Sequence, residues 1–317
     1  MVRSVVRGVG HYLPERVVEN AEFEASIDTS DEWIRSRSGI ERRHFAAVGQ
    51  GTSDLATRAA EAALADAGLV PDDIDAVILA TSTPDLTFPS AATMVQARLG
   101  MTRGFAYDVQ AVCAGFVFAL ANADAMIRAG LARRALVIGA ETFSRLMDWT
   151  DRSTCVLFGD GAGAVVIEAA PGGGTAADRG ILAADLHSDG RHRGILYVDG
   201  GVSTGTIGHL RMQGKEVFRH AIEKLAGTAH AALDKAGLTG ADVDWIVPHQ
   251  ANLRIIAGTA QRMQVPMDRV VVTVQDHGNT SAASIPLALS VARARGQIRP
   301  GDLLVAEAIG GGLAWGA

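Results

Sequence analysis

A cysteine stands where a predicted strand gives way to a predicted helix. Cys113 follows the strand-like Asp108-Val-Gln-Ala-Val and opens the run Ala-Gly-Phe-Val-Phe-Ala-Leu. A thiol at a helix N-terminus feels the positive end of the helix dipole, which lowers its pKa and favours the thiolate. Cys113 is therefore a candidate nucleophile, and the alternative is a core cysteine packed among Ala, Val and Phe.

A histidine and an asparagine occupy comparable positions later in the chain. His249 lies in Ile246-Val-Pro-His-Gln-Ala-Asn-Leu-Arg, after a predicted strand and before a predicted helix. Asn279 lies in Asp276-His-Gly-Asn-Thr-Ser-Ala-Ala-Ser, at another turn that leads into a helix. Each alone could be a cap or turn residue, and only the combination with Cys113 suggests catalysis.

A faint internal repeat relates the segments that carry these residues. Three short matches recur in the same order at nearly one offset: Ala67-Gly68-Leu69 with Ala236-Gly237-Leu238, Val109-Gln110 with Val274-Gln275, and the run 137–141 with 303–307. Such self-similarity predicts two similarly folded halves, 1–170 with Cys113 and 175–317 with His249 and Asn279. Pseudo-symmetric halves would bring the turns of Cys113 and Asn279 together.

The composition predicts layers of helices on buried sheets. The chain has 317 residues, of which 48% are hydrophobic, 5% are aromatic and 36 are glycines. Short apolar runs at 76–80, 135–139 and 164–167 predict buried strands, and helices are predicted at 52–67 and 218–236. Alternation of this kind is typical of an α/β fold. The stretch 187–211 lacks periodicity and predicts a long functional loop.

Several classes of protein are disfavoured. The net charge is -6 without a basic stripe, which argues against nucleic-acid binding. No apolar run is long enough to cross a membrane, and the N-terminus lacks the apolar core of a signal peptide. Two cysteines predict no disulfide framework and a cytoplasmic location. The histidines His187, His192 and His209 lack paired spacing, so no metal is expected.

Two glycine clusters could bring backbone amides close to a ligand. Gly159-Asp-Gly-Ala-Gly163 runs directly into a predicted strand instead of opening a helix, so a dinucleotide loop is excluded. Gly310-Gly311-Gly312 could supply the N–H groups of an oxyanion hole, and the alternative is a tight turn.

An ordered set of motifs over nearly the whole chain resembles the β-ketoacyl-acyl-carrier-protein synthase III family. Single fragments are weak, but the ordered set is specific. The fragments include Gly8-Val-Gly-His-Tyr-Leu-Pro, Thr29-Ser-Asp-Glu-Trp-Ile, Phe88-Pro-Ser-Ala-Ala, the Cys113 segment, Phe158-Gly-Asp-Gly-Ala-Gly, Pro248-His-Gln-Ala-Asn and Gly278-Asn-Thr-Ser-Ala-Ala-Ser.

The resemblance implies the thiolase fold: two pseudo-duplicated halves in αβαβα layers with mixed five-stranded sheets, assembled as a homodimer. It also implies a catalytic set of Cys113, His249 and Asn279. Elongating synthases carry a second His in place of Asn279, and thiolases carry a second Cys near the C-terminal glycines. Cys155 lies in an apolar run and is predicted to belong to the core.

The implied reaction initiates fatty-acid synthesis without a metal or organic cofactor. Cys113 takes the acyl group of an acyl-CoA, acetyl-CoA by expectation, while the backbone N–H groups of Cys113 and Gly311 hold the oxyanion. A malonyl-acyl-carrier protein then enters and loses CO₂. His249 and Asn279 stabilise the enolate by hydrogen bonds, and the carbanion attacks the acyl-cysteine.

The resemblance also assigns binding residues. The CoA site would comprise Trp33, Arg37, Arg152, Phe218 and Asn252, the acyl pocket Phe88 and Ile309, and the carrier-protein patch Arg219, Arg254 and Arg262. Ordinary surface packing is the alternative for Trp33, and a solvated face is the alternative for Arg37.

Two other functions remain open at this stage. A starter synthase of a polyketide pathway would keep the same fold and catalytic set, and substrate profiling would distinguish it. A binding module for acyl-CoA or carrier protein would not need Cys113, His249 and Asn279 together, so their presence argues against it.

Overall fold

The N-terminal part of the chain forms a mixed five-stranded sheet. The computed structural model describes residues 1–317. The strands are β1 (Val2–Tyr12), β4 (Ala76–Ala80), β5 (Phe105–Val109), β6 (Arg134–Thr142) and β7 (Asp160–Pro171), in the order β1-β7-β6-β4-β5. Strand β4 is parallel to β5 and β6, whereas β7 is antiparallel to β6 and β1. The three predicted strands are confirmed.

The C-terminal sheet has four strands, where the family resemblance implied five. They are β8 (Leu186–Ser188), β11 (Trp245–Pro248), β12 (Leu304–Gly310) and β13 (Ala314–Gly316), in the order β11-β12-β13-β8. On the outer side of β11, where a fifth strand would pair, the structure has a single parallel bridge, between Ile246 of β11 and Val270. The Gln250 side chain then bonds the backbone of Val271, Thr273 and Val274. A side chain thus takes the groups that a fifth strand would use.

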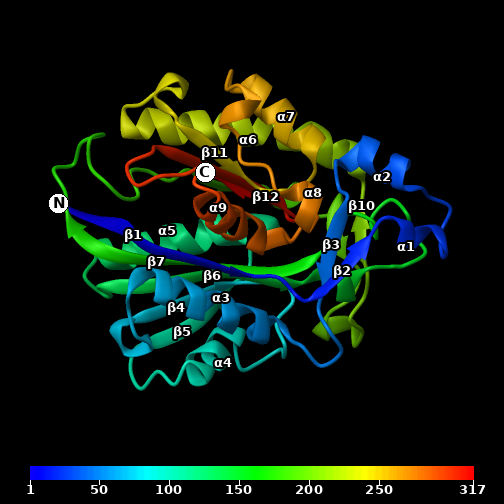
Figure 1. Ribbon diagram of the computed structural model, residues 1–317, viewed down its shortest axis with the longest axis horizontal. Coiled ribbons are helices and arrows are strands. Elements are labelled where there is room, and N and C mark those ends of the chain that lie inside the picture. The colour runs from blue at the N-terminus through cyan, green and yellow to red at the C-terminus, as the bar shows by residue number, and fades with distance from the viewer.

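Helices separate and cover the two sheets in five layers (Figure 1). Helices α5 (Gly115–Arg128) and α9 (Ser284–Ala294) lie between the sheets. Helices α3 (Thr52–Ala67) and α4 (Ala91–Arg98) cover one outer face, and α6 (Gly214–Ala236) and α7 (Leu253–Arg262) cover the other. Alternate residues of β4 face the two layers: Ile78 packs with the central cluster, and Val77 and Leu79 pack with the α3 side.

The predicted helices are confirmed, and one begins earlier than expected. Helix α3 ends at Gly68 with φ 66°, and α6 ends at Gly237 with φ 70°, the left-handed caps that glycine adopts freely. Helix α6 starts at Gly214, four positions before the predicted start at Phe218.

The segment 187–211 is not the irregular loop that its sequence predicted. It contains β9 (Leu196–Val198), which pairs with β10 (Leu210–Met212) as an antiparallel hairpin. The strands are three residues each, too short for a periodic signal. The other small elements are β2 (Arg16–Glu19), β3 (Arg42–Phe45), α1 (Ala21–Glu24), α2 (Asp31–Ser38) and α8 (Val274–His277).

The structure corrects the match between the Cys113 and Asn279 turns. Short 3₁₀ turns precede both central helices, at Val112–Ala114 before α5 and at Ser281–Ala283 before α9. The helices begin at residues 115 and 284, 169 positions apart, so Cys113 corresponds to Ala282. The earlier match, between Val109 and Val274, has an offset of only 165 positions. The four residues of helix α8 account for the difference between the two offsets. Asn279 therefore lies three residues before the counterpart of Cys113.

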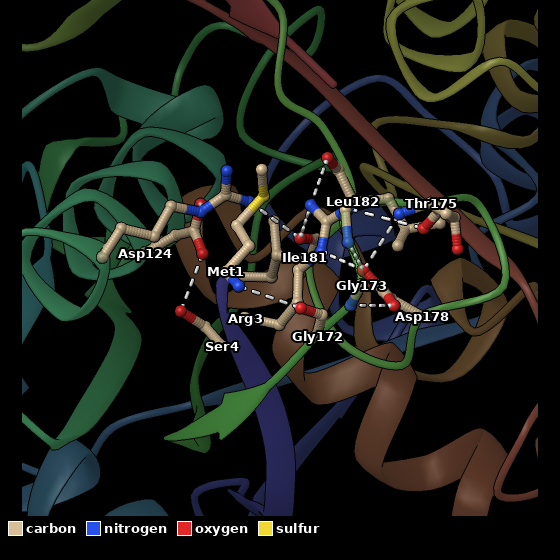
Figure 2. A network of polar contacts seen from close by, with 12 residues as sticks. Met1, Arg3, Ser4, Asp124, Gly172, Gly173, Thr175, Asp178, Ile181 and Leu182 are labelled. Carbon is tan, nitrogen blue, oxygen red and sulfur yellow. Dashed lines mark hydrogen bonds and ion pairs between the residues drawn. The ribbon is translucent and has the colours of Figure 1, made fainter.

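Polar contacts fasten the segment after β7 to the first strand (Figure 2). The Arg3 side chain is 6% exposed, and its Nε donates to Asp178 Oδ2 at 2.9 Å. The N–H groups of Gly173 and Gly174 donate to the same carboxylate. Since these bonds stabilise the charged form, the pKa of Asp178 is lowered. The segment thus follows a fixed path toward β8.

Candidate active site

Cys113 sits in a turn against the end of β12. Its side chain is 4% exposed, and Val112 before it has a φ of 49°, which side-chain-bearing residues seldom adopt. A Cβ on Gly310 would lie 2.6 Å from the Cys113 nitrogen and 2.8 Å from the Ala111 oxygen. Only a glycine at position 310 allows this close approach of β12 to the nucleophile turn.

The thiol of Cys113 is neutral in the resting protein. Burial raises its pKa to about 12, and the nearby Glu141 carboxylate raises it further, whereas a hydrogen bond with the Ser281 side chain lowers it. The sequence predicted a lowered pKa from the helix dipole, and this expectation was wrong because burial outweighs the favourable contacts. Formation of the thiolate therefore requires a proton acceptor.

His249 follows β11 and is held by two contacts. Its backbone N–H donates to the Glu307 carbonyl at 2.8 Å, and its Nδ1 lies 2.7 Å from Ser284 Oγ. Ser284 Oγ accepts from the Gln250 N–H at 3.3 Å, and Nδ1 is the only acceptor within hydrogen-bond distance of the buried hydroxyl, so the hydroxyl proton is assigned to Nδ1. This arrangement leaves the proton of a neutral imidazole on Nε2. Burial lowers the pKa of His249 to about 3, which keeps the ring neutral.

Asn279 is oriented by its neighbours. Its backbone N–H donates to the Leu157 carbonyl at 2.9 Å, and its own carbonyl accepts from the Gly159 N–H at 3.0 Å. Its Oδ1 accepts from the Ser281 N–H at 2.9 Å. The acceptor end of the amide is thus occupied, and its NH₂ group remains a donor without a partner in the protein.

The elements that carry these residues contact one another. The turn 112–114 contacts both the turn 281–283 and β12, and β11 pairs with β12 in parallel register. The arrangement offers a buried thiol, the Nε2–H of His249 and the amide NH₂ of Asn279. The His249 and Asn279 side chains both offer hydrogen-bond donors, which the stabilisation of an oxyanion or enolate requires.

The sequence reasoning missed three residues around this site. Ser284 contacts His249 Nδ1, and Ser281 bonds Glu141 Oε1 at 3.1 Å. Glu141 is completely buried at the end of β6. A carboxylate inside an otherwise apolar run was the available signal for Glu141, because a buried charge requires partners. Ser281 and Ser284 lie in the Asn279 motif, where their proximity to the other turn is not visible.

Comparisons with known proteins place the chain in a family. Residues 107–190 match the family model of 3-oxoacyl-[acyl-carrier-protein] synthase III, and residues 233–317 match its C-terminal model. A β-ketoacyl-[acyl-carrier-protein] synthase III of Cereibacter sphaeroides is 81% identical, covering 100% of this chain and 98% of the relative. The chain belongs to the β-ketoacyl-acyl-carrier-protein synthase III family. It is an acyltransferase of the condensing-enzyme class, which initiates fatty-acid synthesis.

Solved structures confirm the thiolase-like fold. The 3-oxoacyl-[acyl-carrier-protein] synthase III of Aquifex aeolicus superposes with a TM-score of 0.93 at 44% identity, covering 99% of this chain and 98% of that one. The priming β-ketosynthase of the R1128 polyketide pathway superposes with a TM-score of 0.92 at 36% identity, covering 99% and 94%. The family fold therefore extends over the whole synthase chain.

Gly310, the last residue of β12, and Gly311, the next residue, approach different partners. Gly310 lies against Cys113, whereas a Cβ on Gly311 would lie 2.8 Å from the Leu196 oxygen of β9. The hairpin of β9 and β10 thus supports the loop that follows β12. The role of the Gly311 N–H as an oxyanion donor remains a prediction.

Three of the predicted CoA residues form one cluster, in which Trp33 is half-buried and Arg37 and Arg152 are exposed. The guanidinium groups of Arg37 and Arg152 lie 4.5 Å and 5.2 Å from the Trp33 ring centroid. Arg152 also donates to the Asp28 carboxylate at 2.9 Å. Trp33 and Arg37 are one helical turn apart on α2, so the helix brings them together. A planar, electron-rich ring and two cations suit a nucleotide with phosphates.

Phe218 and Asn252 lie at a second place, where α6 meets α7. The Arg254 guanidinium is 5.6 Å from the Phe218 ring centroid. Asn252 caps α7, because its Oδ1 accepts from the Ile255 N–H at 2.9 Å. Its NH₂ group is left available for a ligand.

The two residues predicted for the acyl pocket, Ile309 and Phe88, lie in different surroundings within one subunit. Ile309 is 6% exposed and packs with Leu225 and Leu313, whereas Phe88 is 82% exposed on the loop between β4 and α4. The predicted carrier-protein residues Arg219, Arg254 and Arg262 are all exposed on α6 and α7. Arg219 pairs with Glu216 at 2.7 Å.

Two further observations bear on ligands and membranes. No group of three His, Cys, Asp or Glu side chains is arranged to hold a metal ion. None of the helices combines the length and apolar character that a membrane crossing requires.

Cys155 is a fully buried free thiol in a hydrophobic cluster, as predicted.

Proposed function

We propose that this synthase joins a starter acyl group from acyl-CoA to the carbanion of malonyl-acyl-carrier protein, through an acyl-Cys113 intermediate. The orientation of two side chains is the observation that supports this assignment. His249 is held at Nδ1 and Asn279 at Oδ1, so both direct donor groups away from their anchors. Two neutral donors beside a buried thiol suit the stabilisation of an enolate.

The first half-reaction loads the enzyme. The thiolate of Cys113 attacks the acyl carbonyl of the CoA thioester. The N–H groups of Cys113 and Gly311 hold the oxyanion, and collapse of the adduct expels CoA. The acyl group then lies in apolar surroundings that include Ile309, which fits a short starter, with acetyl-CoA expected.

The second half-reaction forms the carbon–carbon bond. His249 Nε2–H and Asn279 Nδ2–H donate to the thioester carbonyl of the malonyl group. Loss of CO₂ leaves an enolate that these donors stabilise, and its carbon attacks the acyl-cysteine. Cys113 leaves as a thiolate, and the product is a 3-ketoacyl thioester. No metal or organic cofactor takes part in this proposal.

Two surfaces would receive the substrates. Trp33, Arg37 and Arg152 would bind the nucleotide of CoA, and Phe218 and Asn252 would line the route of its pantetheine arm. The exposed Arg219, Arg254 and Arg262 would attract an acidic carrier protein to a chain with a net charge of -6. Because catalysis requires a reduced thiol at Cys113, a cytoplasmic location is expected.

The enzyme would act as a homodimer. Strand β5 is an edge of the N-terminal sheet, and its Phe105 is 40% exposed. Leu86 and Phe88 on the neighbouring loop are 53% and 82% exposed. An open edge beside large exposed apolar side chains suits a symmetric contact with a second copy. Phe88 would then enter the acyl pocket of the partner subunit.

Separate variants test the two half-reactions. With Cys113→Ala, transfer of the acyl group from CoA should be abolished. With His249→Ala and Asn279→Ala, Cys113 should still be acylated, whereas decarboxylation of malonyl-carrier protein should fall at least about 100-fold. Normal decarboxylation in both variants would remove them from these roles.

A starter synthase of a polyketide pathway is the second candidate. The structural match to the R1128 priming β-ketosynthase favours it, although the identity is only 36%. Turnover with a panel of acyl-CoAs distinguishes the two. Preference for acetyl-CoA with malonyl-carrier protein supports the fatty-acid role, and exclusive use of an unusual starter supports the polyketide role.

A further inference from the structure

A completely buried arginine lies beside the segment that holds Asn279. Arg43 is 0% exposed on β3, which pairs with β2 and contacts α8 (Figure 1). Its guanidinium donates to three neutral acceptors, the Val18 carbonyl at 3.3 Å, Asn20 Oδ1 at 2.8 Å and the Val156 carbonyl at 2.6 Å. A buried cation is costly unless hydrogen bonds satisfy it, so these acceptors are held in place around the guanidinium.

The bond to Val156 fixes the start of the segment on which Asn279 depends. The Asn279 N–H donates to the Leu157 carbonyl at 2.9 Å, and the Asn279 carbonyl accepts from the Gly159 N–H at 3.0 Å. These two bonds form an isolated parallel bridge between Phe158 and Asn279, outside any strand. Because the bridge is not extended into a ladder, the position of Asn279 depends on what holds residues 156–159.

The Arg43 side chain also packs against both chains of this bridge. A Cβ on Gly159 would lie 3.0 Å from the Arg43 Cβ, and a Cβ on Gly278 would lie 3.1 Å from the same atom. Gly159 is bonded to Asn279, and Gly278 precedes Asn279 in the chain. Glycine at both positions allows the close approach, so Arg43 supports the bridge by packing as well as by its hydrogen bond.

The remaining contacts of Arg43 lead to other parts of the fold. Asn20 Nδ2 donates to Asp31 Oδ1 and to the Ile40 carbonyl, both at 2.8 Å. The Asn20 amide therefore connects the guanidinium to the start of α2. The guanidinium also lies 4.8 Å from the Phe23 ring centroid. Since these contacts involve residues outside 156–159, a variant of Asn20 can separate them from the contact with Val156.

We propose that Arg43 is a positioning residue for decarboxylation, an inference that rests on the proposed function. Arg43 holds residues 156–159, and these residues hold the backbone of Asn279, whose NH₂ group donates to the malonyl thioester. None of the hydrogen bonds of Arg43 involves Cys113 or His249. Loading of Cys113 should therefore be insensitive to Arg43, whereas decarboxylation, which requires Asn279, should depend on it.

Separate measurement of the two half-reactions tests this role. Arg43→Met keeps an unbranched apolar chain and removes the donors. Its kcat for release of CO₂ from malonyl-carrier protein should fall about 10- to 100-fold, because displacement of Asn279 by about 1 Å misaligns the NH₂ group. The KM for malonyl-carrier protein should change little. Acylation of Cys113 at saturating acetyl-CoA should stay within about 2-fold of the wild-type rate.

Asn20→Ala is the matched control. It removes the contact between Arg43 and Asn20 but leaves the bond to Val156, so CO₂ release should stay within about 2-fold of wild type. Equal losses in both half-reactions of Arg43→Met would overturn the proposal. A loss of CO₂ release in Asn20→Ala as large as that in Arg43→Met would also overturn it.

Arg43→Lys keeps the charge and serves as the test if Arg43→Met does not fold. Arg43 bonds Asn20 through Nη1 and Val156 through Nη2. Lysine has one nitrogen on a shorter chain and cannot reproduce this fork, so CO₂ release should fall about 3- to 10-fold with normal acylation. Wild-type CO₂ release in folded Arg43→Lys would overturn the proposal.

Crystal structures of the wild type and Arg43→Lys separate this inference from the proposed function. Asn279 should be displaced from Leu157 and Gly159 in Arg43→Lys and should stay in place in Asn20→Ala. An Asn279 that does not move in Arg43→Lys would contradict the positioning role. If the wild type neither acylates Cys113 nor releases CO₂, while Asn279 moves in the variant, the positioning role is supported and the proposed function is wrong.

Discussion

The hydroxyl group of Ser284 decides which nitrogen of His249 carries the proton. Ser284 Oγ accepts from the Gln250 N–H and lies 2.7 Å from His249 Nδ1, which is the only acceptor within reach of the hydroxyl, so the hydroxyl proton is directed to the ring. The Nε2–H tautomer that results is the donor required for decarboxylation. A serine on α9 thereby sets the chemistry of a histidine that follows β11.

Ser284→Ala should reduce decarboxylation of the malonyl thioester about 5- to 10-fold, because one hydrogen bond worth about 1 kcal/mol fixes the tautomer. Acylation of Cys113 should remain near the wild-type rate. Ser290→Ala is the control, since Ser290 lies on the same helix as Ser284 and its Oγ contacts the Nδ1 of His11, on β1, at 2.8 Å. Equal effects of the two variants on decarboxylation would contradict the role of Ser284.

The sequence indicated the residue types of the site better than their electrostatics. Cys113, His249 and Asn279 stand in recognisable motifs at strand-to-helix turns. The raised pKa of Cys113 depends on how completely the surrounding layers exclude water, which local sequence does not encode. The contact of Ser281 with Glu141 spans 140 positions, so no spacing rule could predict it.

At the scale of elements, the end of β12 controls the geometry of the nucleophile turn. Gly310→Ala should distort this turn, because its Cβ would lie 2.6 Å from the Cys113 nitrogen. We expect destabilisation of about 1–3 kcal/mol and a marked loss of Cys113 acylation. Gly227→Ala in α6 is the control, since nothing lies within 4 Å of its added Cβ. The free energy of unfolding of the Gly227→Ala variant should increase by up to about 1 kcal/mol.

Urea unfolding and single-turnover acylation measure both effects. If Gly310→Ala acylates at the wild-type rate and unfolds at the wild-type urea concentration, then close packing of β12 against the turn is not required.

Strand β12 also carries a buried carboxyl group without hydrogen-bond partners. Glu307 is 1% exposed, both carboxyl oxygens lack partners, and burial raises its pKa well above the usual value. Below pH 4.5, near its unfolded pKa, both states are protonated and the group has no effect. As pH rises, the unfolded chain releases the proton while the folded chain keeps it, so stability falls by about 1.4 kcal/mol per pH unit.

Glu307→Gln should remove this contribution. The stability of the variant relative to wild type should therefore increase from pH 5 to pH 7, by roughly 1.4 kcal/mol per pH unit in urea unfolding. Groups such as Glu141 titrate in both proteins, so their contributions cancel in the difference. A constant difference between the proteins over this range would show that Glu307 does not remain protonated in the fold.

The elements with strong local signals were predicted correctly. The runs at 76–80 and 52–67 became β4 and α3 with those bounds, because continuous burial and a glycine stop define them locally. The fifth strand of the C-terminal sheet was not formed, because Gln250 satisfies the backbone there. The β9–β10 hairpin was missed because its strands are short.

At the scale of the whole molecule, residues from distant parts of the chain build the site. We propose that 1–170 and 175–317 are duplicated halves, supported by the similar order of their strands and by α5 and α9 lying together between the sheets. One half contributes Cys113 and Glu141, and the other contributes His249, Asn279 and Ser281. The halves share a hydrophobic cluster that includes Phe45 and Val305, so neither is expected to fold alone.

The proposed dimer predicts a mass in solution of twice the 33.1 kDa of one chain. Phe105→Glu, on the edge strand β5, should produce monomers in light scattering, because it places a charge in the contact. Val6→Glu is the control, since Val6 is 45% exposed on β1, the opposite edge of the same sheet. A dimer that survives Phe105→Glu and dissociates with Val6→Glu would place the contact on the other edge.

Intact-protein mass spectrometry after incubation with acyl-CoAs tests the central claim most directly. The account predicts one acyl adduct, mapped to the peptide of Cys113, which disappears as a 3-ketoacyl product when malonyl-acyl-carrier protein is added. The mass of the preferred adduct identifies the starter. An adduct on another residue, or no adduct with any acyl-CoA, would contradict the assignment of Cys113 as the acyl-carrying nucleophile.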